Sequence, residues 1–264
     1  MALSRAPDGT AFEVHGPEDA PAVALIHGLG LCRALWAQHL DAFGAYRVIT
    51  YDLYGHGDSA PPPVEASLTV YSDQLAGLLD HLQMPKAAVV GFSIGGMINR
   101  RFALDHGGRL SALAILNSPH DRGEEGQRAV EDRARTVRDQ GALATMEAAL
   151  ARWFTAAFRA ERPDVMQQVK DWRLMADPES YAQAAWVLAN GVRELIRPVQ
   201  PITTPSLVLT CENDTGSTPA MSHAIASEIA GSETVIVPDL QHLGLMEDPD
   251  AITAPVLGFL SRTI

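Results

Sequence analysis

The sequence predicts an α/β fold in which helices cover both faces of a mostly parallel, doubly wound sheet. Two patterns support this prediction. Short, continuous apolar runs of strand length are bounded by Gly, Pro, Asp or Asn, and longer segments with apolar residues at helical spacing lie between them. This alternation is typical of parallel sheets, because each parallel connection needs a crossover, which is usually a helix. A chain of 264 residues can form one such domain with a small insertion.

The individual elements follow from these two patterns. Buried strands are predicted at residues 22–26, 47–51, 87–90, 110–116, 207–210 and 234–237. Helices are predicted at residues 68–83, 97–105 and 219–229 and from 249 onward. The last two helices begin at Pro219 and Pro249, where proline is tolerated because the first amides of a helix have no partner within it.

One region interrupts the alternation. Between residues 120 and 199 we find only helical patterns, over 127–140, 143–158, 165–175 and 180–190. We therefore expect residues 1–119 and 200–264 to form the core, and residues 120–199 to form a helical cap inserted between two strands. The expected cap holds 12 of the 20 basic residues and 13 of the 32 acidic residues, so it is nearly neutral in an acidic chain.

Composition and charge exclude several classes of protein. Asp and Glu outnumber Lys and Arg by 32 to 20, whereas nucleic-acid binders usually carry a basic excess that neutralises phosphates. No apolar run approaches the roughly 18 residues of a membrane span, and the N-terminus lacks the apolar run of a secretory signal. Cys32 and Cys211 are too few for a disulfide framework or a cysteine-based zinc site. We therefore expect a cytoplasmic protein that binds neither nucleic acid nor membrane.

The segment Gly91-Phe92-Ser93-Ile94-Gly95-Gly96 lies between a predicted strand and a predicted helix. In a sharp strand-to-helix turn, small residues two before and two after a serine prevent clashes. The hydroxyl then projects above the sheet at a helix N-terminus, where negative charge is favoured. The alternative is a purely structural Gly-rich turn. The strand–turn–helix context favours Ser93 as a nucleophile.

A serine nucleophile needs a base that accepts its proton and an acid that orients the base. In this architecture the acid and then the histidine follow the serine along the chain, at the carboxyl ends of later strands. Asp214 follows the predicted strand 207–210, and His242 follows the predicted strand 234–237. Glu212 is the alternative acid. The spacing favours Ser93, Asp214 and His242 as a catalytic triad.

Acyl transfer also needs donors for the tetrahedral oxyanion. The segment His27-Gly28-Leu29-Gly30 follows the first predicted strand, where a His-Gly loop supplies one backbone N–H. We expect the amides of Leu29 and Ile94 to form the oxyanion hole. His27 is expected to be a structural hydrogen-bonding group, because another histidine is already the base, and His39 is expected on a helix surface.

These motifs, with Asp52 and the segment Gly55-His56-Gly57-Asp58-Ser59, resemble the α/β-hydrolase superfamily over nearly the whole chain. The resemblance implies an α/β-hydrolase fold and its Ser-Asp-His triad. The fold hosts esterases, lactonases, C–C hydrolases, perhydrolases, dehalogenases and epoxide hydrolases. The last two use an aspartate nucleophile, so Ser93 argues against both. The Gly-rich turn that follows Asp52 is expected to have a conformational role.

The expected cap is similar to that of 3-oxoadipate enol-lactonases, which open a small enol-lactone ring that bears a carboxylate. The similar segments are Leu150-Ala151-Arg152-Trp153-Phe154-Thr155, Phe158-Arg159 and Asp177-Pro178-Glu179-Ser180-Tyr181, together with Trp36. The chain departs from that family at Gly28-Leu29-Gly30-Leu31-Cys32 and at Ser118-Pro119-His120. Because these two segments are expected near the pocket, the substrate can be another lactone or ester.

A carboxylate-bearing substrate needs a cation at the pocket, and arginine fits a carboxylate bidentately. Arg152 is the candidate for this contact, and Trp36, Trp153 and Phe154 are candidates for the pocket wall. The alternative for Trp153 and Phe154 is that they fill the core of the cap. The alternative for the basic residues of the cap is that they form solvated helix pairs with nearby acids: Arg133, Arg135 and Arg138.

The sequence therefore predicts a hydrolase that cleaves a small carboxylic ester or lactone through an acyl-enzyme on Ser93. No metal or organic cofactor is expected. A C–C bond hydrolase and a cofactor-free perhydrolase are alternatives that keep the same triad. A ligand receptor on this fold, with slow turnover, is the non-enzymatic alternative.

Overall fold

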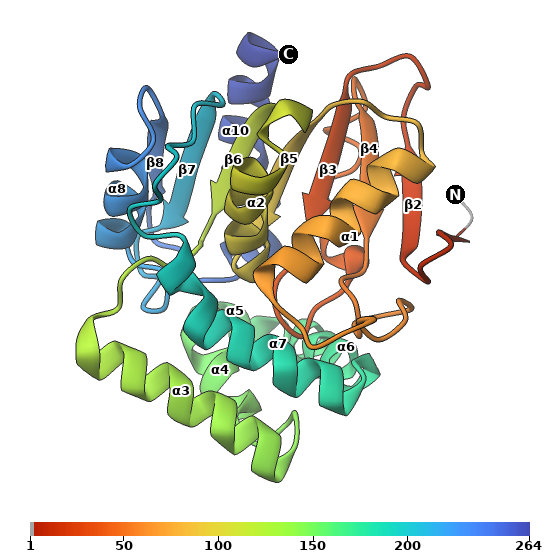
Figure 1. The fold of residues 1–264 in the computed structure, drawn as a ribbon. Coiled ribbons are helices and arrows are strands. Elements are labelled where there is room, and N and C mark those ends of the chain that lie inside the picture. The colour runs from red at the N-terminus through yellow and green to blue at the C-terminus, as the bar shows by residue number, and fades with distance from the viewer. Residues whose placement is uncertain (1–2) are drawn as a thin grey trace.

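The computed structural model describes residues 3–264 and contains one eight-stranded sheet with helices on both faces (Figure 1). The strands are β1 (Ser4–Arg5), β2 (Ala11–His15), β3 (Ala22–Ile26), β4 (Arg47–Tyr51), β5 (Ala87–Phe92), β6 (Leu110–Leu116), β7 (Ser206–Cys211) and β8 (Glu233–Val237). The helices are α1 (Leu68–His81), α2 (Ile94–Asp105), α3 (Gly123–Gln140), α4 (Met146–Trp153), α5 (Ala156–Glu161), α6 (Pro163–Met175), α7 (Pro178–Asn190), α8 (Pro219–Ser227), α9 (Gly244–Glu247) and α10 (Pro249–Thr263).

The strand order in the sheet is β1-β2-β4-β3-β5-β6-β7-β8. All pairings from β4 to β8 are parallel, whereas β2 is antiparallel to both of its neighbours. All six predicted strands are present, and β3, β4 and β6 have the predicted bounds. The sequence patterns did not identify β1 and β2, because β1 has two residues and β2 is only partly buried. The predicted α/β class is confirmed, with an antiparallel edge added.

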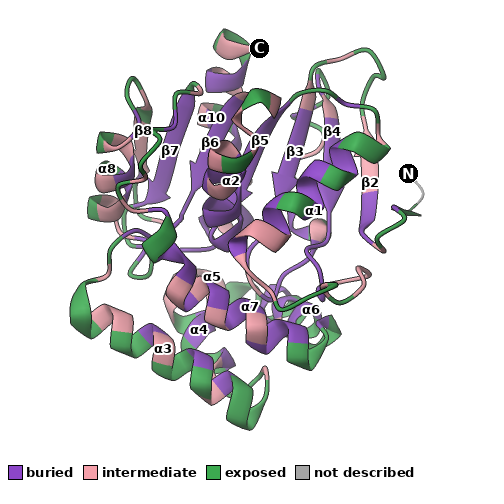
Figure 2. Ribbon diagram, viewed as in Figure 1, coloured by how far each residue is buried: buried purple, intermediate pink, exposed green. Residues whose placement is uncertain are grey.

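Two apolar layers separate the sheet from the helices. Helices α1, α2 and α8 pack on one face, where Ile98 is buried, and α10 packs on the other face through Val256. Neighbouring residues of β5 contribute to opposite layers, Val89 to the first and Val90 to the second, which explains why its apolar run is continuous. Figure 2 shows the central strands buried, while the outward sides of the helices are exposed. No helix among residues 3–264 is both long and apolar enough to cross a bilayer.

Helices α3–α7 lie between β6 and β7 in the sequence, and we call them the helical insertion. Figure 1 shows them stacked beyond one end of the sheet. The helix predicted over 143–158 is in fact two helices, because Phe154 is extended (φ −128°, ψ 146°) and the Thr155 hydroxyl caps α5 by accepting the Phe158 N–H. At this break the Trp153 carbonyl accepts the Leu243 N–H at 2.9 Å, which ties the helical insertion to the loop after β8.

The Gly-rich turn after β4 also contacts the helical insertion, at the start of α7. Gly55 has φ +71°, and its carbonyl accepts the Asp177 N–H at 2.9 Å. A Cβ at Gly55 would lie 2.0 Å from Cβ of Ser180 at the start of α7. The buried carboxylate of Asp52 accepts the Asp58 N–H at 2.9 Å and so holds the turn closed. The expected conformational role of this turn is confirmed.

The expected position of His39 is wrong. Residues 37–40 form turns rather than a helix, and His39 is only 2% exposed. Its Nδ1 lies 2.6 Å from Oγ1 of Thr253 on α10. Burial lowers the pKa of His39 to about 4. The sequence pattern gave no sign of this burial, because the covering helix comes more than 200 residues later.

Candidate active site

Ser93 lies in a tight turn between β5 and α2, as its sequence context predicts. Its backbone has φ 60° and ψ −115°, a conformation that costs energy for any residue with a side chain. A Cβ at Gly91 would lie 2.1 Å from the Gly95 carbonyl oxygen, and a Cβ at Gly95 would lie 2.7 Å from the Ile26 carbonyl oxygen. Larger residues would therefore force the turn apart, and glycine at both positions lets it close beneath Ser93.

The structure brings Ser93, His242 and Asp214 into one chain of hydrogen bonds. His242 Nε2 lies 3.1 Å from Ser93 Oγ, and His242 Nδ1 lies 2.6 Å from Asp214 Oδ2. The three residues follow β5, β8 and β7, so the sheet brings them together at its carboxyl edge. The alternative acid, Glu212, is exposed and accepts the Asp239 N–H instead.

The Asp214 carboxylate is buried and fully hydrogen-bonded. Oδ1 accepts the amides of Gly216 and Ser217 at 2.8 and 2.9 Å, and Oδ2 accepts Asn117 Nδ2 at 3.0 Å as well as His242. Burial alone would raise the pKa of Asp214, but His242 and the hydrogen bonds outweigh it and hold the pKa below its ordinary value. The carboxylate is therefore an anion that can orient His242 and stabilise its protonated form.

Sequence reasoning missed Asn117. It directly follows β6 and has φ +46°, a left-handed conformation that asparagine tolerates better than most residues. From there its amide reaches both Thr210 Oγ1 and Asp214 Oδ2. An asparagine at the carboxyl end of a predicted strand, next to the strand that carries the acid, was the available signal.

The expected oxyanion donors are the amides of Leu29, in the loop after β3, and of Ile94, which directly follows Ser93. Leu29 lines the same pocket as Ser93, and Ile94 is the first residue of α2. Within residues 3–264, neither amide donates a hydrogen bond to a protein acceptor. Amides that have no protein acceptor are suited to donate to a developing oxyanion.

His27 has the structural position that the sequence predicted. It is fully buried; its Nε2 accepts the Leu53 N–H at 2.9 Å, and its Nδ1 lies 2.8 Å from the Gly28 carbonyl oxygen. Burial lowers the pKa of His27 to about 4, although the hydrogen bond to Gly28 opposes this shift. Both ring nitrogens are occupied, so His27 is not available as a base and instead holds the loop that precedes Leu29.

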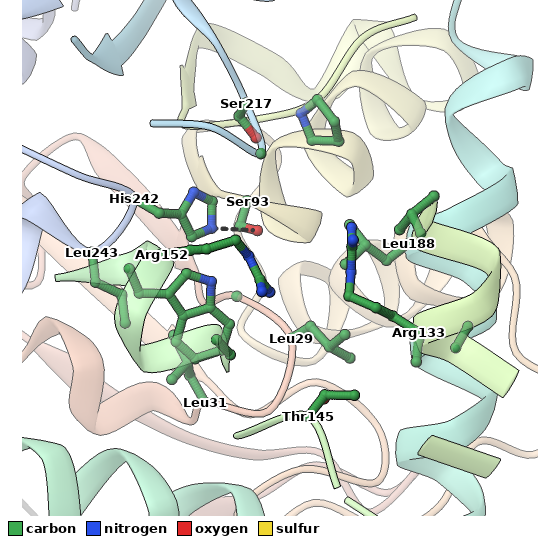
Figure 3. Close-up of a pocket in the computed structure, with 18 of the residues that line it drawn as sticks. Leu29, Leu31, Ser93, Arg133, Thr145, Arg152, Leu188, Ser217, His242 and Leu243 are labelled. Carbon is green, nitrogen blue, oxygen red and sulfur yellow. Dashed lines mark hydrogen bonds between the residues drawn. The ribbon is translucent and has the colours of Figure 1, made fainter. Parts of the chain in front are cut away.

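A pocket of about 960 Å³, including its open mouth, lies between the sheet edge and the helical insertion. Ser93 and His242 form part of its wall, and Figure 3 shows the hydrogen bond between them. Trp153 lies over His242, with 6.2 Å between the ring centroids. Among residues 3–264 no three His, Cys, Asp or Glu side chains are grouped to hold a metal ion.

Two of the four expected substrate contacts are in this pocket. Arg152 and Trp153 line it, whereas Trp36 and Phe154 do not. Trp36 is 2% exposed and Phe154 is fully buried, stacked on Phe158 in the hydrophobic core. The expectation that Trp36 and Phe154 contact the substrate is therefore not retained, since both side chains point into the core.

Three further arginines line the pocket and were not expected there: Arg122, Arg133 and Arg173. The prediction of a solvated helix pair holds for Arg135, which pairs with Glu131 and Asp132. It is wrong for Arg133 and for Arg138, whose guanidinium carbon instead lies 5.8 Å from the centre of the Trp186 ring. The signal for Arg133 was its spacing, because it lies on the same side of α3 as the buried Val130 and Val137.

Comparisons with known proteins agree with this geometry. The family model described as "Alpha/beta hydrolase family" matches residues 23–254. The 3-oxoadipate enol-lactonase 2 of Acinetobacter baylyi is 30% identical over 253 residues, which cover 95% of this chain and 92% of that protein. The crystal structure of the enol-lactonase from Burkholderia xenovorans has a TM-score of 0.87 at 28% identity and covers 98% of this chain and 100% of its own. A thermophilic esterase from Thermogutta terrifontis, determined with malate bound, has a TM-score of 0.84 at 31% identity, with coverages of 96% and 93%. This chain belongs to the alpha/beta hydrolase family.

Proposed function

We propose that this protein hydrolyses a small carboxylic ester or lactone through an acyl-enzyme formed on Ser93. The observation that carries the proposal is the chain of hydrogen bonds from Ser93 Oγ through His242 to Asp214, with the Leu29 and Ile94 amides beside it. A serine becomes a competent nucleophile when a histidine accepts its proton and an acid orients that histidine. The pocket supplies the room for an acyl group next to Ser93.

In the acylation step Ser93 Oγ attacks the substrate carbonyl carbon while His242 Nε2 accepts the hydroxyl proton. The Leu29 and Ile94 amides donate to the resulting oxyanion. The tetrahedral intermediate then collapses, the bond to the leaving alcohol oxygen breaks, and His242 gives that oxygen its proton. In a lactone the leaving oxygen stays attached to the acyl group, so ring opening leaves the whole molecule on Ser93.

In the deacylation step a water molecule attacks the acyl carbon after giving a proton to His242. The second tetrahedral intermediate collapses, Ser93 recovers its proton from His242, and the carboxylic acid leaves. Asp214 keeps His242 in the tautomer that has its proton on Nδ1 and stabilises the protonated ring in both steps. This cycle consumes one water molecule for each bond cleaved, and no cofactor takes part in it.

The finer part of the proposal concerns the substrate. We propose a small enol-lactone such as 3-oxoadipate enol-lactone. Two of the similar proteins reported above are enol-lactonases, and Arg152 and Trp153 line the pocket of this chain. An arginine in the wall fits the free carboxylate of such a ring. The open-chain ester is the alternative within the same chemistry.

The test is the turnover of 3-oxoadipate enol-lactone beside p-nitrophenyl acetate, with Ser93→Ala as the control. A fluorophosphonate that labels the wild type but not Ser93→Ala would identify the nucleophile independently of any substrate. We expect ring opening to exceed ester cleavage greatly and Ser93→Ala to lose both activities while it keeps its circular dichroism spectrum. Wild-type turnover by Ser93→Ala would overturn the mechanism. Ester cleavage without ring opening would overturn only the choice of substrate.

A further inference from the structure

The pocket is rich in positive charge. Four arginines line it, Arg122, Arg133, Arg152 and Arg173, and Asp214 is the only acidic residue in its lining among residues 3–264. The Asp214 carboxylate already accepts hydrogen bonds from His242, Asn117 and two backbone amides, so it does not pair with the arginines. The chain therefore builds an excess of cations around the proposed nucleophile and leaves them without counter-charges, although the protein as a whole carries a formal charge of −12.

None of the four forms a salt bridge within residues 3–264, but Arg122 donates to the Leu188 and Ala189 carbonyl oxygens, whereas the other three make no such hydrogen bond to another helix. Within residues 3–264, Arg133, Arg152 and Arg173 form no salt bridge, and the only side-chain hydrogen bond among them joins Arg152 to a carbonyl of its own helix. The contrast with outward-facing arginines of α3 is clear, because Arg128 pairs with Glu124. Arg128, on the outer side of α3, thus has an acidic partner, whereas within residues 3–264 the arginines that line the pocket have none.

Arg173 is the most confined of the three. It is 2% exposed, and its Nε and Nη1 are buried without a hydrogen-bond partner. Its guanidinium carbon lies 4.9 Å from the centre of the Trp153 ring and 5.5 Å from that of Tyr181. A Cβ at Gly30 would lie 3.1 Å from its Nε, so Arg173 packs directly against the loop that presents the Leu29 amide.

The positive charges of the pocket arginines repel one another. Burial lowers the pKa of Arg152, and the neighbouring Arg133 and Arg173 lower it further. Burial also lowers the pKa values of Arg133 and Arg173. Arg173 is buried, Arg152 is half-buried and Arg133 is exposed. A buried cation without a partner, such as Arg173, destabilises a folded protein, and a bound anion removes that cost. The same arrangement therefore favours anionic ligands over neutral ligands of similar shape.

We infer that the site selects an ester or lactone that carries two free carboxylates. This inference rests on the proposed hydrolysis of an ester or lactone by Ser93, and it predicts that a ring with two carboxylates binds more tightly than 3-oxoadipate enol-lactone, which carries one. One carboxylate would bind Arg173 beside the Leu29 loop, and the second would bind between Arg133 of α3 and Arg152 of α4, whose side chains both point into the pocket in Figure 3. A substrate with a single carboxylate would leave at least one of these three arginines without a counter-charge. Arginine is suited to this recognition because its planar donors match a carboxylate.

A series of three five-membered lactones tests the inference. γ-Butyrolactone is neutral, paraconate carries one carboxylate and the lactone of isocitrate carries two, while the reacting ring is the same. Their dissociation constants are measured by calorimetry with Ser93→Ala, which cannot hydrolyse them by the proposed mechanism. We expect each added carboxylate to tighten binding about tenfold or more. Equal affinity for paraconate and the lactone of isocitrate, or no measurable binding of the latter, would overturn the inference.

The two proposals can fail separately. If the wild type hydrolyses none of the three lactones, nor 3-oxoadipate enol-lactone, nor p-nitrophenyl acetate, but Ser93→Ala binds the three lactones in the expected order, the proposed function fails and the dicarboxylate site stands. If the wild type hydrolyses γ-butyrolactone with a kcat/KM at least equal to that of the lactone of isocitrate, the esterase mechanism stands and the dicarboxylate site fails.

Three single substitutions, made in the Ser93→Ala background, test the residues: Arg133→Gln, Arg152→Gln and Arg173→Gln. Each is expected to lower the affinity ratio of the lactone of isocitrate to γ-butyrolactone by about tenfold or more, whereas Arg128→Gln on the outer side of α3 leaves the ratio unchanged.

The midpoint of thermal unfolding without ligand is a second readout. A purely structural arginine would lower it when removed, whereas Arg152→Gln is expected to raise it, because the repulsion from Arg133 and Arg173 is relieved. A lowered midpoint with an unchanged ratio would overturn the assignment of Arg152.

Discussion

His242 Nδ1 lies 2.6 Å from Asp214 Oδ2, whereas Glu212, only two residues earlier in the sequence, is exposed and contacts the Asp239 amide. The turn after β7 makes this distinction. The Gly216 and Ser217 amides both donate to Asp214 Oδ1 and point the carboxylate toward the sheet edge. Which of two neighbouring acids meets the histidine is therefore decided by backbone hydrogen bonds around the acid.

Asp214→Asn should lower kcat about ten-thousandfold. The asparagine amide would donate to His242 Nδ1, so the ring would have its proton on Nε2 and could not accept the Ser93 proton. Steady-state kinetics with p-nitrophenyl acetate measure the effect, and Glu212→Gln is the matched control, expected to have wild-type kcat. A larger loss in Glu212→Gln than in Asp214→Asn would show that the acid is wrongly assigned.

Asn117→Gly should lower kcat about tenfold to a hundredfold with little change in KM. The substitution removes the 3.0 Å hydrogen bond to Asp214 Oδ2 but keeps the left-handed backbone, which glycine adopts freely. Asn117 does not line the pocket, so substrate contacts remain. Kinetics that separate kcat from KM test this, with the exposed Asn213→Ala as control. A rise in KM at constant kcat would contradict a positioning role.

Much of the candidate site could be predicted because its signals are local or topological. The Gly91-x-Ser93-x-Gly95 spacing reflects contacts within one turn, and those contacts are present. Asp214 and His242 could be proposed because parallel strands place their carboxyl ends at the same sheet edge. Neither inference needed knowledge of how distant helices pack.

The pocket wall could not be predicted in the same way. Phe154 and Trp36 were carried over from a family resemblance, but the break between α4 and α5 leaves Phe154 in the core. Arg173 was not recognised, because its confinement depends on Trp153, Tyr181 and the Leu29 loop meeting in three dimensions. Which side chains of an amphipathic helix face a cavity is fixed by tertiary packing, which a single sequence records only weakly.

Gly55→Ala should destabilise the fold more than Gly231→Ala. Both glycines have left-handed backbones, with φ of +71° and +75°, so both substitutions cost about 1–2 kcal/mol of strain. A Cβ at Gly55 would also lie 2.0 Å from Ser180, whereas nothing lies within 4 Å of one at Gly231. This overlap adds about 1–3 kcal/mol. Urea unfolding measures both variants, and equal losses would show that the helical insertion does not press on Gly55.

His39 should make the stability of the fold depend on pH between about 4 and 6.5. Burial lowers its pKa to about 4 in the folded state, whereas an unfolded histidine titrates near 6.5. Within this interval the unfolded chain binds the extra proton, so the free energy of unfolding rises with pH and falls as acid is added. The contribution of one such group approaches about 1.4 kcal/mol per pH unit in the middle of the interval.

His39→Gln removes this titration while it keeps a side chain that can hydrogen-bond to Thr253. Urea unfolding at a series of pH values from 4 to 7 should show a slope shallower than that of the wild type by up to about 1.4 kcal/mol per pH unit. The exposed His223→Gln is the control and should retain the wild-type slope. His27 and His56 are also buried, with pKa values lowered by burial to about 4 and about 3, so part of the pH dependence should persist in His39→Gln. An unchanged slope would mean that His39 accepts a proton without leaving its contact with α10.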